Sequence, residues 1–136
     1  MSTGLLHLHH YLPFLFFVVL IISIARAVSN KIPNPKKDIF LTLTLIFAHI
    51  QLLLGLVLLM PLAADVDWGA VMGNSASRFL LVEHPFTMLL GVILITVGKV
   101  KAKKIEDVVK ANKTIAIYFI IALVLIALRT PWDKLI

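Results

Sequence analysis

Four long apolar stretches constrain the fold of this chain more than any other feature. They cover about residues 5–27, 38–62, 78–98 and 114–130. A helix that crosses the hydrocarbon core of a bilayer needs about 20 residues. The fourth stretch is short, and we expect it to borrow flanking residues whose long side chains reach the interface. We therefore predict a single domain over residues 1–136 with four transmembrane helices.

The composition agrees with a membrane protein. Apolar residues make up 60% of the chain, charged residues 15%, and the mean hydropathy is +1.01. Such values are typical of chains that reside in a bilayer. The chain contains no cysteine, which excludes disulfides, thiolate metal sites, iron–sulfur clusters and covalently attached c-type haem. Histidine is then the main candidate metal ligand.

The net charge of +6 follows the predicted topology. Most lysines and arginines fall within residues 26–37 and 99–113, the segments that contain the two loops predicted on one side of the membrane. On the other side the basic residues are Arg78, Arg129 and Lys134. The positive-inside rule places the lysine-rich side in the cytoplasm. We expect an all-α, antiparallel four-helix bundle with both termini outside. Basic residues confined to loops beside lipid do not indicate a nucleic-acid partner.

Ionisable residues inside a membrane helix are costly and often mark a site. The candidates are His7, His9 and His10 in the first span, His49 in the second, Glu83 and His84 in the third, and Arg129 at the end of the fourth. With the helical rise of about 1.5 Å per residue, His9, His84 and Arg129 lie roughly 22 to 26 Å from the cytoplasmic ends of their helices. His49 lies near 16 Å, one or two turns deeper. The polar residues are thus expected to gather in the outer half of the bundle.

Histidines at similar height on different helices suggest a b-type haem, because two imidazoles can reach the iron from opposite faces of the ring. The depths favour His9 with His84. Other residues that could contact such a group are Gln51 and Gly55 in the second span, Met88 and Gly91 in the third, and Arg78 and Arg129, whose guanidinium groups could bind propionates.

Simpler interpretations exist for the same residues. A histidine in a membrane helix often forms an interhelical hydrogen bond. Glu83 could pair with Arg78, Met88 could pack in the core, and the glycines could allow close helix approach. The chain could then be an accessory subunit without a cofactor. A third hypothesis is a divalent-metal or proton-handling site built from the histidines and Glu83.

Several short segments resemble a known family. They are Leu8-His9, the run from His49 to Gly55, Glu83-His84-Pro85 followed by Met88, and Pro131-Trp132. Together they look like small four-helix bacterial membrane proteins labelled "cytochrome B", along nearly the whole chain. Members tend to carry an arginine soon after the first-span histidine, where this chain has Pro13 and Phe14.

The resemblance implies a haem b protein of the bacterial inner (cytoplasmic) membrane, with iron ligands drawn from His9, His49 and His84. It implies an electron carrier or a respiratory-complex subunit, with a quinone or other subunits as partners. The sequence has no nucleophile elbow, phosphate-binding glycine loop or zinc-hydrolase motif. A self-contained hydrolase is therefore not expected.

Overall fold

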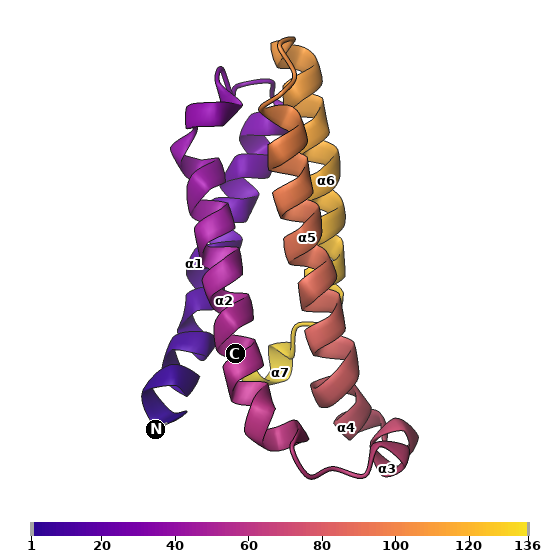
Figure 1. The fold of residues 1–136 in the computed structure, drawn as a ribbon. Coiled ribbons are helices and arrows are strands. Elements are labelled where there is room, and N and C mark those ends of the chain that lie inside the picture. The colour runs from indigo at the N-terminus through magenta and orange to yellow at the C-terminus, as the bar shows by residue number, and fades with distance from the viewer. Residues whose placement is uncertain (1, 136) are drawn as a thin grey trace.

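The computed structural model describes residues 2–135, and this part of the chain is helical along most of its length, with no strand (Figure 1). The main helices are α1 (Ser2–Val28), α2 (Ile39–Ala63), α5 (His84–Ala102) and α6 (Val108–Leu128). The shorter elements are η1 (Pro35–Lys37), α3 (Trp68–Gly73), α4 (Ser75–Arg78), the π-helical turn η2 (Phe79–Glu83) and α7 (Trp132–Leu135). With α4 and η2, α5 forms one continuous helix from Ser75 to Ala102.

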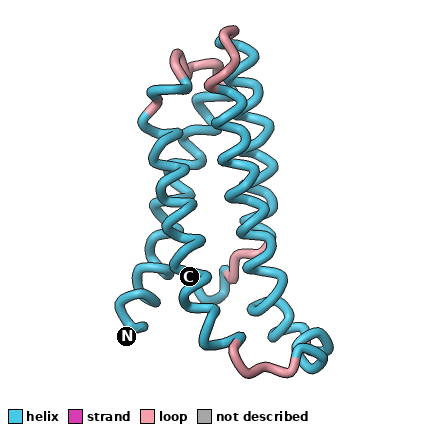
Figure 2. The backbone as a smooth tube through the Cα atoms, in the orientation of Figure 1, coloured by secondary structure: helices cyan, strands magenta, loops and turns pink. Residues whose placement is uncertain are grey.

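The predicted all-helical fold, with four helices long and apolar enough to cross a membrane, is confirmed. Helix α1 packs on α2 and α5 packs on α6, and the two pairs meet through contacts of α1 with α6 and of α2 with α5. The connections 29–38 and 103–107 lie together at one end, which we call the loop end (Figure 2). The N-terminus and α3 lie toward the opposite end, which we call the terminal end.

Local capping explains where these helices begin and end. Asp38 accepts a hydrogen bond from the backbone N–H of Leu41 at the start of α2, and Asp107 accepts one from Val109 at the start of α6. Asn30, with φ of 54°, follows the C-terminus of α1 in the left-handed conformation that suits asparagine. The basic connector predicted over residues 99–113 is shorter, with only residues 103–107 between the two helices, because lysine favours helix and Asp107 starts α6 early.

Helices α2 and α5 are more deeply buried toward the loop end than toward the terminal end. On α2 the buried residues are Leu41, Thr44 and Ala48, and every residue from 49 to 63 is half-buried or exposed. On the facing helix, residues 75–90 are likewise half-buried or exposed, and burial begins at Gly91. The part of the bundle where the sequence predicts a site is therefore the less deeply buried part.

Two glycines bring α5 close to α6. A Cβ atom at Gly91 would lie 2.6 Å from Cγ1 of Ile126, and one at Gly98 would lie 2.6 Å from Cβ of Tyr118. Such distances leave no room for a side chain, and close packing through small residues is common in membrane helix pairs. The interpretation of Gly91 as space for a macrocycle is wrong, because Ile126 of α6 fills that space.

Candidate functional site

His9 on α1 is held by two residues of α2. The side-chain nitrogen of Gln51 lies 3.0 Å from Nδ1 of His9 and donates to the His9 carbonyl oxygen at 2.7 Å. One turn further along α2, a Cβ atom at Gly55 would lie 3.1 Å from Cε1 of the His9 ring. Gly55 therefore accommodates the imidazole, and Gln51 fixes its position.

The hydrogen bond from Gln51 also selects a tautomer. An amide nitrogen can only donate, so Nδ1 of His9 accepts, and a neutral imidazole then carries its proton on Nε2. Oε1 of Gln51 is buried and has no hydrogen-bond partner among residues 2–135. An unpartnered buried oxygen is costly, so this amide has an unused acceptor next to the His9 ring.

His84 is oriented by the C-terminal end of α6. Its Nδ1 lies 2.7 Å from the carbonyl oxygen of Arg129. Because a carbonyl only accepts, Nδ1 donates and Nε2 keeps its lone pair. The Phe79 ring stacks on the imidazole with a centroid distance of 6.2 Å. His84 and His9 lie on different helix pairs, on α5 and α1 respectively.

A π-helical turn precedes His84. The backbone N–H of His84 bonds to the carbonyl oxygen of Phe79, five residues back. The next residue is Pro85, which has no N–H and whose ring crowds the carbonyl four residues earlier in an α-helix. The wider turn relieves that crowding, and π turns are frequent at functional sites. The helix thus widens locally just before Pro85.

The predicted ion pair between Arg78 and Glu83 is present. Nε of Arg78 lies 2.9 Å from Oε2 of Glu83, and Nε of Arg129 lies 3.7 Å from Oε1. Arg78 also donates to the carbonyl oxygen of Met72. All three charged groups are partly exposed. Both arginines proposed for propionates therefore already share Glu83.

Two other predicted residues lie apart from the His9–Gln51 contact. His49 is exposed; its Nδ1 donates to the carbonyl oxygen of Leu45 on its own helix at 2.7 Å, and its Nε2 lies 3.5 Å from the Thr96 hydroxyl. Met88 packs against the apolar core, as its simpler interpretation predicts. Residues 2–135 hold no group of three or more His, Asp or Glu side chains placed to bind a metal ion, so the geometry gives the divalent-metal hypothesis no support.

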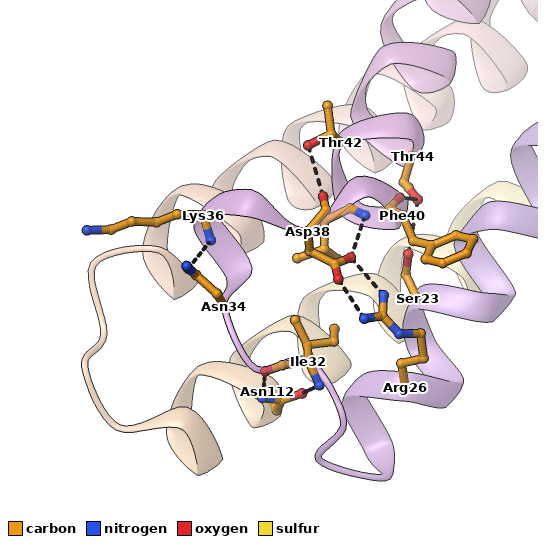
Figure 3. Close-up of polar contacts among 11 residues, drawn as sticks. Ser23, Arg26, Ile32, Asn34, Lys36, Asp38, Phe40, Thr42, Thr44 and Asn112 are labelled. Atoms are coloured by element: carbon orange, nitrogen blue, oxygen red, sulfur yellow. Dashed lines mark hydrogen bonds and ion pairs between the residues drawn. The ribbon is translucent and has the colours of Figure 1, made fainter.

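The sequence reasoning missed a polar cluster at the loop end (Figure 3). The guanidinium group of Arg26 donates two hydrogen bonds, of 2.8 and 2.6 Å, to the Asp38 carboxylate. The Ser23 and Thr44 hydroxyls lie 3.2 Å apart between α1 and α2. Burial by itself raises the pKa of Asp38, but the bonds from Arg26 and from backbone N–H groups outweigh it and lower that pKa below its usual value. These contacts close the α1–α2 pair.

Asn112 connects the other helix pair to the same loop. Its side chain is fully buried, accepts from the N–H of Ile32 at 3.0 Å and donates to the carbonyl oxygen of Ile32 at 2.9 Å (Figure 3). Opposite charges at positions 26 and 38 are a sequence signal for the Arg26–Asp38 pair. No sequence signal indicates that Asn112 meets Ile32, which lies 80 residues away.

Comparison of the chain with family models, with curated proteins and with solved structures yields no match. The function is therefore argued from the site alone.

Proposed function

We propose that this chain is a cytochrome b-like protein of the bacterial inner membrane, related to the small proteins labelled "cytochrome B". In this proposal the four helices form an antiparallel bundle with the loop end in the cytoplasm and both termini outside. One haem b lies between α1 and α5 in the outer half and takes part in electron transfer, either in a respiratory complex or with a quinone.

The observation that carries the proposal is the His84–Arg129 hydrogen bond. A histidine that ligates a metal typically donates its other ring N–H to a carbonyl or carboxylate, which fixes the tautomer and aims the free nitrogen. His84 has this arrangement, with Nδ1 bound to a backbone carbonyl and Nε2 free to bind. Residues 49–63 and 75–90 are half-buried or exposed. A haem bound between these two segments would complete the packing there, and this supports the proposal.

His9 could supply the second haem ligand after one adjustment. Its Nε2 has no hydrogen-bond partner in the described part of the chain, because only Nδ1 is engaged by Gln51. Binding iron through Nε2 requires Nδ1 to become the donor, so the Gln51 amide must turn its unpartnered Oε1 toward the ring. Arg78 and Arg129 would hold propionates at the terminal end, in competition with Glu83.

In such a site the haem would supply reversible one-electron chemistry at the iron. The protein residues would hold and orient it and exclude water. The decisive experiment is a reduced-minus-oxidised absorption spectrum of the purified, folded protein. We expect a Soret band and an α band of b type. A well-folded sample reconstituted with haem that lacks both bands would refute the proposal.

The second candidate function is an accessory membrane subunit without a cofactor. The Arg78–Glu83–Arg129 contacts favour it, because both arginines already have the Glu83 carboxylate as a partner. Gly91 and Gly98 also serve helix packing alone. Under this hypothesis, replacement of His84 would change assembly or stability and leave no spectral trace.

A further inference from the structure

A groove with a volume of about 840 Å³ opens at the loop end, between the two connections that join α1 to α2 and α5 to α6. Asn34 and Lys36 line one wall, and Lys103, Lys104, Glu106 and Val108 line the other. In Figure 3, Asn34 and Lys36 lie beside the loop that leads into α6. The groove is remote from His9 and His84, which lie toward the opposite end of the helices.

Three ammonium groups and one carboxylate border this groove. Lys36, Lys103 and Lys104 are exposed, and none of them forms an ion pair with any residue from 2 to 135. Glu106 is also exposed and offsets part of their charge. Oδ1 of Asn34 accepts from the backbone N–H of Lys36, and its amide N–H groups have no partner in the described part of the chain. The groove is therefore a concave surface rich in donors for an anion.

The rim of the groove is apolar on the side of the membrane helices. Val108, the first residue of α6, is 40% exposed, and its neighbour Val109 is 59% exposed. An anion bound among the lysines would thus lie directly beside apolar surface that continues along the helices. In the topology proposed above, this is the height of the phospholipid headgroups.

We propose that this groove binds the phosphate group of an anionic phospholipid, with Lys36 on one loop and Lys103 and Lys104 on the other. Free phosphate offers the same chemistry to the lysines, but only a lipid also covers the exposed valines. A lipid held between the two loops would link α1–α2 to α5–α6 at the loop end. The proposal does not depend on haem binding.

The test measures thermal unfolding of the full-length protein in a neutral detergent, with three additives: short-chain phosphatidylglycerol, short-chain phosphatidylcholine and inorganic phosphate. We expect phosphatidylglycerol to raise the unfolding temperature in a saturable way and the other two to leave it unchanged. No shift with phosphatidylglycerol, or an equal shift with phosphatidylcholine, would overturn the proposal. An equal shift with inorganic phosphate would overturn the lipid assignment and indicate a free-phosphate site.

Matched variants separate a defined site from general electrostatic attraction. Replacement of Lys36, Lys103 and Lys104 by glutamine should weaken the apparent affinity by about fivefold per lysine. The control replaces Lys31, Lys37 and Lys110, which are exposed near the same end but do not line the groove, and should retain the affinity. Equal losses in the two triple variants would overturn the proposal. Glu106→Gln offers an independent check, because removal of the only carboxylate in the lining should strengthen binding.

Discussion

Nδ1 of His84 donates to the carbonyl oxygen of Arg129 at 2.7 Å, and this single bond links the start of α5 to the end of α6. It satisfies a carbonyl that the end of α6 leaves without a helical partner. It also leaves Nε2 of His84 free. The bond therefore has a structural role whether or not a haem is present. Variants must separate this structural role of His84 from its proposed role as an iron ligand.

The substitution His84→Asn separates them. The asparagine Nδ2 can take the place of Nδ1 and donate to Arg129, but asparagine offers no ring nitrogen to iron. We expect the haem absorption bands to disappear while the unfolding temperature stays close to that of the wild type. His84→Leu should lose both the bands and some stability. Retention of a full b-type spectrum in His84→Asn would exclude His84 as the iron ligand.

His49→Leu is the matched control for that experiment. His49 is exposed and bonds to its own helix through Leu45. We expect His49→Leu to keep the absorption bands of the wild type, measured in the same spectra. Loss of the bands in this variant, with His84→Asn unaffected, would assign the ligand to His49 instead.

Gln51 controls the tautomer of His9. In Gln51→Glu a carboxylate can only accept, so Nδ1 of His9 must donate and Nε2 is freed for the metal. We expect Gln51→Glu to bind haem at least as fully as the wild type. Gln51→Leu, which removes the bond, should bind less and lose about 1 kcal/mol of stability. The difference in haem binding is measured as the haem content per protein. Equal haem content in both variants would show that Gln51 does not orient His9 for iron.

Gly98 sets the distance between α5 and α6. A Cβ atom there would lie 2.6 Å from Cβ of Tyr118, an atom close to the backbone that cannot rotate away. We expect Gly98→Ala to lower the free energy of unfolding by about 1–3 kcal/mol. The control is Gly4→Ala, because Gly4 has no atom within 4 Å of its would-be Cβ. Unfolding in a denaturing detergent provides the measurement, and a Gly98→Ala protein as stable as the control would contradict the packing described.

The Arg26–Asp38 pair should make stability depend on pH. The pKa of Asp38 is lower in the folded protein than its usual value, so folding is favoured when the carboxylate is charged. The stabilisation is complete above the usual aspartate range, near pH 4, and is lost as the pH falls through the lower folded pKa. We expect Asp38→Asn to unfold at a lower temperature than the wild type at pH 7.

The difference between Asp38→Asn and the wild type should shrink as the pH is lowered below about 4. Asp65→Asn, at an exposed position, serves as control and should follow the wild type at every pH. A constant difference between Asp38→Asn and the wild type from neutral to acidic pH would contradict the argument from charge.

Asn112 should contribute more to stability than a surface polar residue. Its amide bonds to both backbone groups of the buried Ile32. Asn112→Leu leaves both groups without a partner, which costs about 1–3 kcal/mol for each group. Lys113→Leu, at the exposed neighbouring position, should have little effect. Similar unfolding temperatures for the two variants would show that the N–H and carbonyl groups of Ile32 find other hydrogen-bond partners when Asn112 is replaced.

The sequence by itself determined the number and approximate limits of the four long apolar helices. Length and hydropathy are local properties, and a helix satisfies its backbone hydrogen bonds within its own segment. The predicted second span begins at Asp38, and in the structure Asp38 caps α2, which begins at the next residue. The fourth helix was predicted to begin near residue 114, but α6 begins at Val108, after its cap Asp107. Hydropathy does not detect the first turns of α6 because they contain several polar side chains.

Only the tertiary structure decided how polar residues far apart in the sequence pair. His9 meets Gln51, His84 meets Arg129 and Asn112 meets Ile32, over separations of 42, 45 and 80 residues. Depth estimates from helical rise predict the height of a residue but not the direction of its side chain around the helix axis. That direction depends on which faces of α1, α2, α5 and α6 pack together. The same packing places Gly91 against Ile126 and leaves His49 exposed, because each glycine or histidine takes its role from the neighbouring helix that it faces.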